Sequence, residues 1–248
     1  MAVDLNCDLG EGAAEDERIV PLVSSVNVAC GFHAGDASTI RATVRLAARH
    51  GVAVGAHPSY PDRAGFGRAP VERTPSQVRD DVVYQVAAVR AFCAAEGVPL
   101  VHVKPHGALY NAAAQDRALA AAIAEAVREV DPGLVVVCLA ASPMAGVVRS
   151  LGLRCAEEAF ADRGYTPEGT LVPRGTAGAL LEDPAAVAER VSTMARERRV
   201  RSVTGALVSV AADTICLHGD TPGAAALAAA IRARLAADGV DVRPLRRG

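Results

Sequence analysis

Five short strings of polar residues and glycine gather the side-chain types that catalyse hydrolysis. A carboxylate or an imidazole positions or deprotonates water, and an ammonium group stabilises negative charge on an oxygen atom. Glycines beside these groups allow the backbone to approach a ligand closely. Together they indicate hydrolysis of a polar bond or activation of a carbonyl group. The strings are NCDLGE from Asn6, CGFHAGD from Cys30, GAHP from Gly55, KPHG from Lys104 and HGD from His218.

Lys104 is the only lysine among the 26 basic residues that are lysine or arginine. Arginine is planar and always protonated, whereas lysine carries a compact ammonium whose pKa its surroundings can shift. Wherever a generic positive charge was sufficient, this sequence uses arginine. We therefore expect Lys104 to perform a task that arginine cannot.

Each polar string also has alternative interpretations. A lone Asp or His beside a glycine is often a turn former or a helix cap, and Asp36 and Asp220 could be caps only. An aspartate with two or three histidines could instead hold a divalent metal ion, although no HExxH or comparable spacing supports one. No GxxxxGKS or GxxxxGKT string is present, so this chain does not bind ATP by a P-loop. Because polar strings of the same kind recur five times along the chain, a single shared site is favoured over five unrelated turns.

The strings must be positioned by regular elements. Short β-branched runs alternate with alanine-rich stretches of helical period, which is typical of β-α units and a parallel sheet. The 248 residues, of which 51% are hydrophobic, favour one domain over 1–248. Asp36 and Thr74 are expected helix N-caps. We expect strands at about 2–7, 26–31, 52–56, 100–104, 134–139, 153–158 and 214–217, and helices near 37–50, 75–96, 114–130, 142–150, 184–198 and 222–237.

Each polar string lies at the C-terminal end of an expected strand. In a β/α barrel or an open parallel sheet these ends converge on one face, where active sites are built. The strings should therefore meet in one pocket. The segment 160–183 is typical of a long loop or short hairpin, and such loops are usually functional. The run 240–245 could pair at a sheet edge or trail away.

The bulk properties narrow the class of protein further. A formal net charge of -2, with both signs spread along the chain, predicts neither a nucleic-acid partner nor binding to a membrane surface. No apolar run is long enough to span a bilayer, and no basic-then-apolar leader follows Met1, so we expect a cytoplasmic protein. The 6 cysteines include no CxxC pair and mostly interrupt apolar segments, as reduced core cysteines do.

Taken together, the motifs resemble those of the LamB/YcsF family, which is also known as the family of 5-oxoprolinase A subunits. The resemblance runs nearly end to end, but the stretch after Glu11 is shorter here than in many members and offers only the acidic residues Glu15, Asp16 and Glu17. The motifs are DLNCDLGE at 4–11, CGFHAGD at 30–36, GAHPSYPDRAGFGR at 55–68, VKPHGALYN at 103–111, FADRGY at 160–165 and CLHGD at 216–220.

The resemblance implies a seven-stranded β/α barrel, a distorted TIM-like fold of the glycoside hydrolase/deacetylase type. It also implies an ATP-hydrolysing 5-oxoprolinase that opens the lactam of 5-oxoproline to give L-glutamate, together with two partner subunits, B and C. ATP would be bound with or by these partners. The lactam is an unstrained amide, so its carbonyl carbon is a poor electrophile. Phosphorylation of the carbonyl oxygen would activate that carbon for attack by water.

Within that reaction the catalytic residues would be Asp8, His57, Lys104 and His106. Lys104 would neutralise the substrate carboxylate or a developing oxyanion, Asp8 and His57 would orient or deprotonate water, and His106 would carry a proton. The candidate substrate-binding residues are Asn6, Glu11, His33, Tyr60, Arg68, Tyr110, Asn111, His218 and Asp220.

Two rival functions remain open from the sequence. One is a metal-dependent, deacetylase-like hydrolase that acts on an amide, which bound divalent metal would favour. The other is a binding subunit that captures the lactam for catalysis elsewhere in the complex, which unchanged activity after substitution of Asp8 and His57 would favour.

Overall fold

The computed structural model describes residues 1–221 and 223–248. Within them, seven parallel strands close into a barrel, because the last of the seven pairs with both its predecessor and the first. The fold is the predicted β/α barrel. In the order of pairing the strands are β1 (Ala2–Leu9), β2 (Ser25–Ala29), β3 (Ala53–His57), β4 (Leu100–Val103), β5 (Val135–Leu139), β6 (Arg154–Phe160) and β9 (Thr214–Leu217).

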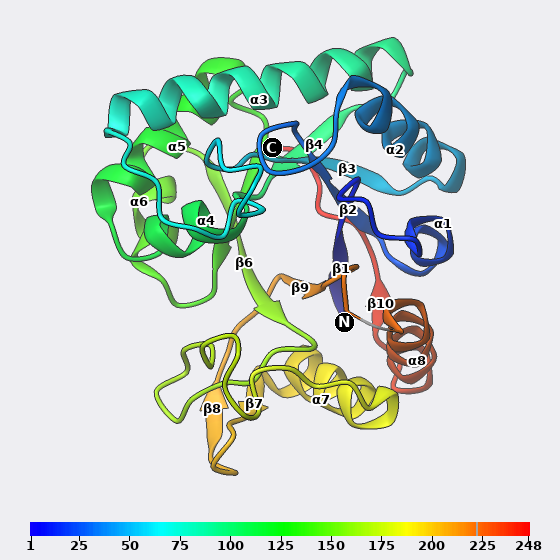
Figure 1. The fold of residues 1–248 in the computed structure, drawn as a ribbon. Helices are drawn as coiled ribbons and strands as arrows, with labels where there is room; N and C mark the ends of the chain where they lie inside the picture. Colours follow the sequence, from blue (N-terminus) through cyan, green and yellow to red (C-terminus); the bar gives the residue numbers. More distant parts are fainter. Residues whose placement is uncertain (222) are drawn as a thin grey trace.

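Helices form a ring around these strands (Figure 1). Asp36 and Thr74 are N-caps as predicted: Asp36 accepts from the Thr39 amide, and Thr74 forms a reciprocal capping box with Gln77. All six predicted helices are confirmed, although position 222, where the last one was expected to begin, lies outside the described residues. They are α2 (Ala37–His50), α3 (Pro75–Ala95), α5 (Arg117–Val130), α6 (Pro143–Ser150), α7 (Pro184–Glu197) and α8 (Ala224–Ala237).

Several short elements were not predicted. Of the two alternatives for 240–245, edge pairing is correct, because β10 pairs in parallel with the start of β1. The segment 160–183 is a loop held by two isolated antiparallel bridges, in agreement with the predicted loop or hairpin. The unpredicted elements are α1 (Asp16–Ile19), the 3-10 helix η1 (Val20–Leu22), α4 (Gly107–Ala113), and the hairpin strands β7 (Arg199–Arg201) and β8 (Leu207–Ser209), whereas β10 (Asp241–Val242) is the expected edge pairing.

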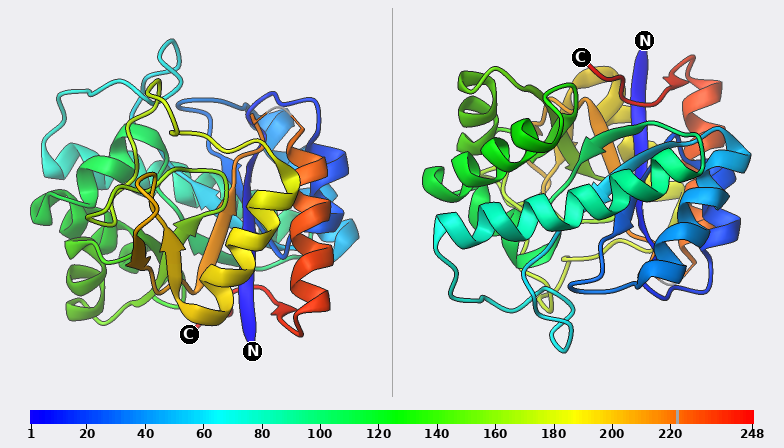
Figure 2. Two further views of the ribbon diagram at one scale, coloured as in Figure 1. Left: turned by 90° about the horizontal axis from the view of Figure 1, so that it is seen from below. Right: turned by 90° about the horizontal axis from the view of Figure 1, so that it is seen from above.

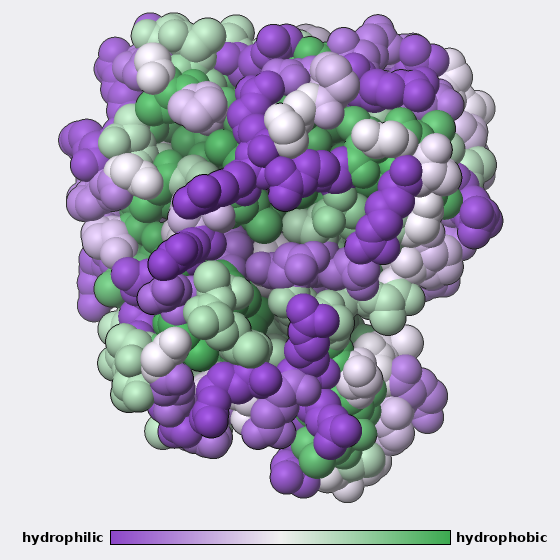
Figure 3. Space-filling model, turned by 180° about the vertical axis from the view of Figure 1, so that it is seen from behind, coloured by the Kyte–Doolittle hydropathy of each residue, from purple (hydrophilic) through white to green (hydrophobic). Residues whose placement is uncertain are grey.

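The two ends of the barrel differ. Figure 2 shows both chain termini at one end and the long loops at the other, towards which the parallel strands run. On the face seen from behind Figure 1, hydrophilic residues are spread widely, with hydrophobic ones between them (Figure 3). No helix in the described part of the chain is long and apolar enough to cross a membrane.

The main hydrophobic core lies between the strands and the surrounding helices, whereas the inside of the barrel is largely polar. Barrels of this type usually fill their interior with layers of branched apolar side chains. Here Asp4 accepts hydrogen bonds from the hydroxyls of Ser24, Ser25 and Thr214, and all four residues are buried. A polar interior is stable only where its groups are hydrogen-bonded, so this one must be highly ordered.

Gly55 is the place where this interior leaves no room for a side chain. It pairs with His102 on the neighbouring strand, and an added Cβ would lie 2.1 Å from His102 Nε2. Gly55→Ala should therefore reduce the free energy of unfolding by about 1–3 kcal/mol or more. Gly146→Ala, in α6, should instead raise it by about 0.4–1 kcal/mol, because nothing lies within 4 Å of the new methyl group. Urea unfolding followed by circular dichroism measures both, and equal stability of the two variants would contradict this packing.

Candidate active site

Lys104 follows β4 and buries its ammonium between two carboxylates. Its Nζ lies 2.9 Å from Asp8 Oδ1 and 3.0 Å from Glu158 Oε1, and its side chain is only 3% exposed. It also lies 3.0 Å from the sulfur of Cys216. Burial opposes the charged form, but Asp8 and the other neighbours outweigh it and raise the pKa of Lys104 well above its ordinary value. The ammonium is therefore a fixed charge.

A chain of side-chain amides supports this ion pair from inside the barrel. Asn6 donates to Glu158 and accepts from both Lys104 and the Nδ2 group of Asn27. Asn27 also donates to Asp8, and its Oδ1 lies 2.7 Å from His102 Nε2. Since that oxygen can only accept, Nε2 of His102 carries the proton. Burial lowers the pKa of His102 to about 3, so the ring is neutral.

Asp8 presents one oxygen to this network and the other to the histidines. Its Oδ1 accepts from Lys104 and Asn27, while its Oδ2 lies 3.4 Å from Nε2 of His57. Burial would favour the protonated acid, but His57 and Lys104 outweigh burial and hold the pKa of Asp8 well below its ordinary value. Asp8 is thus a carboxylate throughout the physiological range.

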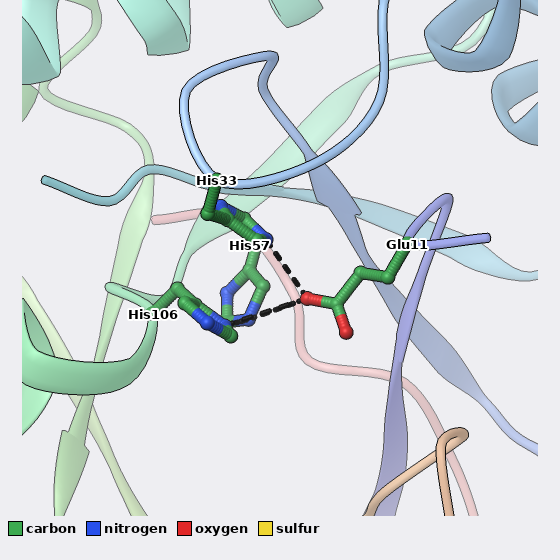
Figure 4. Close-up of side chains that lie close together, drawn as sticks. All are labelled: Glu11, His33, His57 and His106. Carbon is green, nitrogen blue, oxygen red and sulfur yellow. Dashed lines mark hydrogen bonds and ion pairs between the residues drawn. The ribbon is translucent and has the colours of Figure 1, made fainter. Parts of the chain in front are cut away.

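Three histidines and Glu11 lie close together (Figure 4), and one of them, His57, is the neighbour of Asp8. Nε2 of His33 lies 2.8 Å from Glu11 Oε1, and the rings of His33 and His106 stack with centroids 3.9 Å apart. Nδ1 of His106 lies 3.0 Å from Nε2 of His57. Burial lowers the pKa of both His33 and His106 to about 3. The ligand atoms of all four side chains lie within 4.8 Å of one another, so these residues could hold a metal ion.

His218 belongs to a second pair of imidazole and carboxylate. Its Nδ1 lies 2.9 Å from Asp162 Oδ1, and the hydroxyl of Thr221 donates to the other oxygen of the same carboxylate. The ring of His218 stacks on Phe160. Burial opposes ionisation of Asp162, but His218 outweighs it and lowers the pKa of the carboxyl group. The ring of His218 is therefore fixed by its Nδ1 side.

These groups surround one cavity of about 500 Å³ at the mouth of the barrel. The structure brings together most of the predicted site residues there. The predicted residues that line the cavity are Asp8, Glu11, His57, Arg68, Lys104, His106, Tyr110, Asn111, His218 and Asp220.

Three predicted site residues lie outside that lining. Asn6 and His33 are buried behind it, where they contact Lys104 and Glu11 respectively. Tyr60 is part of the hydrophobic core and is only 5% exposed. Tyrosine at such a position fills a core as often as it contacts a ligand, and here packing is what the structure shows.

Two important residues were not predicted as part of the site. Glu158 receives hydrogen bonds from Asn6, from the hydroxyl of Tyr110 and from Lys104, and Asp162 fixes His218. Glu158 lies within β6 and belongs to none of the sequence motifs. Side chains alternate between the two faces of a strand, and this alternation directs Glu158 into the barrel. Asp162 stood in the FADRGY string but was given no role.

Comparison with known proteins agrees with this geometry. The profile that describes the LamB/YcsF family matches residues 3–248. The chain belongs to the LamB/YcsF family. Among LamB/YcsF proteins, the 5-oxoprolinase A subunit of Syntrophobacter fumaroxidans is 49% identical over 247 residues, which cover 98% of each chain. The protein of the same name from Pyrococcus furiosus is 48% identical over 250 residues, covering 99% of this chain and 98% of the relative.

A solved structure of the family shows the same barrel. The lactam utilization protein from Thermus thermophilus superposes with a TM-score of 0.93 and is 48% identical, and the match covers 98% of this chain and 99% of that one. The predicted family and fold are therefore both confirmed.

Proposed function

We propose that this LamB/YcsF protein is the A subunit of an ATP-dependent 5-oxoprolinase. It would hydrolyse the lactam of 5-oxoproline to L-glutamate together with two partner subunits, B and C, in the cytoplasm where ATP is abundant. The observation that carries the proposal is the cavity at the barrel mouth, which joins Asp8, Lys104 and His218 in one pocket. Relatives that match the whole chain at 48–49% identity bear the name of this subunit, which supports the substrate.

The position of Lys104 argues for a different role from binding the substrate carboxylate. The ammonium already has two carboxylates at 2.9 and 3.0 Å, so these three groups together carry one net negative charge. Arg174 lines the same cavity and is exposed. A guanidinium suits a carboxylate because its N–H groups match the two oxygens. We assign the substrate carboxylate to Arg174, and Lys104 to holding Asp8 in place.

Opening the ring requires water to add to the lactam carbonyl carbon and the bond from that carbon to nitrogen to break. The oxygen of Asp8 that faces the cavity accepts a hydrogen bond from water and orients it. A carboxylate with so low a pKa is a weak base, and weak assistance is sufficient only if the carbonyl has already been made a strong electrophile. This explains why the reaction would depend on ATP.

The ring nitrogen must gain a proton as it leaves to become the amine of glutamate. His218 is suited to supply it, because Asp162 fixes its Nδ1 side and leaves Nε2 for the ligand. Ligand atoms of Asp8 and His218 lie within 4.8 Å of each other, which allows both to reach one small ring. The low pKa of His106 makes it a poor proton donor, so we transfer the predicted proton-carrying role to His218.

Among the described residues, the cavity lining leaves no arginine for a phosphate group of ATP once Arg174 binds the substrate carboxylate. Arg163 commits its guanidinium to the backbone carbonyls of Val172 and Ala179, and Arg68 is paired with Asp220 at 2.6 Å. A P-loop is absent from the sequence as well. We therefore place ATP binding and carbonyl activation with the partner subunits and derive no step through ATP here.

The test is ATP-dependent release of glutamate from 5-oxoproline, measured for the chain alone and with both partner subunits. We expect little or no release by the chain alone and steady turnover by the assembled complex. Steady turnover by the chain alone would contradict the placement of ATP. An assembled complex that releases no glutamate would contradict the proposed function itself.

A further inference from the structure

His57 and His106 both direct their second ring nitrogen to the same point. Nδ1 of His57 lies 2.7 Å from the backbone oxygen of Lys104, and Nε2 of His106 lies 2.9 Å from the backbone oxygen of Phe66. A carbonyl oxygen can only accept, so each of these nitrogens carries the proton. The remaining nitrogens, His57 Nε2 and His106 Nδ1, face each other 3.0 Å apart, so that one positive charge, a proton or a metal ion, can bridge them.

Glu11 adds negative charge at the same point. Its Oε1 lies 3.4 Å from Nδ1 of His106 and 3.8 Å from Nε2 of His57. The donor that reaches this group from outside, Nε2 of His33, is directed at Glu11, so these acceptors need a positive charge between them in a buried site. A metal ion can supply that charge in place of a proton.

The spacing fits a first-row metal ion. Metal–nitrogen distances of about 2.0–2.1 Å in a tetrahedral site place neighbouring ligand atoms about 3.3 Å apart. The three separations here are 3.0, 3.4 and 3.8 Å. Two imidazoles and one glutamate are also a ligand set that zinc enzymes use. We propose that Glu11, His57 and His106 bind one divalent transition-metal ion, such as Zn²⁺, at the mouth of the barrel.

His33 completes this site from outside. Among the described residues, the ring of His33 has one hydrogen-bond partner, Oε1 of Glu11, to which its Nε2 can donate. Its Nδ1 is buried and has no hydrogen-bond partner among these residues. Ligating carboxylates and imidazoles commonly have such outer partners, including the backbone carbonyls that hold His57 and His106. His33 is therefore a positioning residue for Glu11.

The neighbouring group of Asp8, Cys216 and His218 shows why the metal belongs to one cluster and not the other. Its ligand atoms also lie within 4.8 Å of one another. However, the ammonium of Lys104 lies 2.9 Å from Asp8 Oδ1 and 3.0 Å from the sulfur of Cys216, so a cation already occupies that position. The Glu11 cluster has no such built-in ammonium among the residues described.

The inference rests on this geometry and not on the proposed reaction, and it is tested on the isolated full-length chain without a histidine tag. The chain is stripped with a chelator, given Zn²⁺, passed through a desalting column and analysed for metal. We expect one retained equivalent, and a higher melting temperature with Zn²⁺ because the ion binds only the folded state. Co²⁺ in the same site should show the visible absorption bands of a cobalt ion coordinated by imidazole. This spectrum can be recorded with the natural chain and requires no variant.

Matched variants separate the site from adventitious binding. Loss of an outer partner weakens metal binding by about 10–100-fold, which we expect for His33→Ala, and loss of a ligand should cost at least about 100-fold, as in Glu11→Gln and His106→Ala. The exposed Glu17→Gln and His50→Ala should bind as the natural chain does.

No retained metal and no shift in melting temperature for the natural chain would overturn the proposal, because His57 would then hold the cluster together as an imidazolium. Unchanged binding by Glu11→Gln would overturn it as well. Glutamate release is measured separately, so a metal-binding chain without turnover would count only against the proposed function.

Discussion

Lys104→Arg should lower the rate of glutamate release by the assembled complex by more than about a hundredfold, although it keeps the positive charge. The ammonium occupies a closed space bounded by Asp8, Glu158 and the sulfur of Cys216 at 2.9, 3.0 and 3.0 Å. A guanidinium is larger and planar, so it cannot hold one compact charge at these distances from both carboxylates. Asp8 should therefore be displaced from the water that it orients.

The control for Lys104→Arg is Arg18→Lys, the opposite exchange at a side chain that is 69% exposed. It should leave turnover unchanged. Gel filtration shows whether each variant still assembles with its partners. Near-normal turnover by an assembled Lys104→Arg complex would remove Lys104 from the groups on which the reaction depends.

Asp8→Asn should stop the reaction while preserving the fold. The amide oxygen can still accept from Lys104 and Asn27, and the new amino group replaces the oxygen that lies 3.4 Å from Nε2 of His57. What is lost is the carboxylate that accepts from water and takes its proton. Loss of such assistance costs about 10²–10⁴-fold in rate. Thermal unfolding of the isolated variant should show a cooperative transition at lower temperature, because Lys104 loses one of its two buried carboxylate partners and keeps Glu158.

Much of the barrel could be predicted from the sequence because its signals are local. The alternation of β-branched and alanine-rich runs located the seven strands, and Asp36 and Thr74 marked helix starts through cap chemistry that depends on a few neighbouring residues. The hairpin of β7 and β8 was missed because its strands have only three residues each, too few to show a period. The short helix α4 was concealed within the string that follows Lys104.

The site was predictable where residues stand at strand ends and obscure where they lie along a strand. The polar strings indicated the convergence of Asp8, His57 and Lys104, since parallel strands end on one face. Glu158 is different: it sits inside β6 and becomes important only because closure of the barrel brings Asn6 and Lys104 against it. Such pairings join residues far apart in the chain and leave no local pattern.

The central claim is that lactam opening occurs in this cavity with Asp8 as the group that orients water. The most direct measurement is the rate of ATP-dependent glutamate release by the assembled complex that contains Asp8→Asn, compared with the natural chain and with the exposed control Asp80→Asn. The account predicts a normal rate for the control and a rate at least about a hundredfold lower for Asp8→Asn, with both complexes fully assembled. A normal rate for the assembled Asp8→Asn complex would contradict it and would place the chemistry in one of the partner subunits.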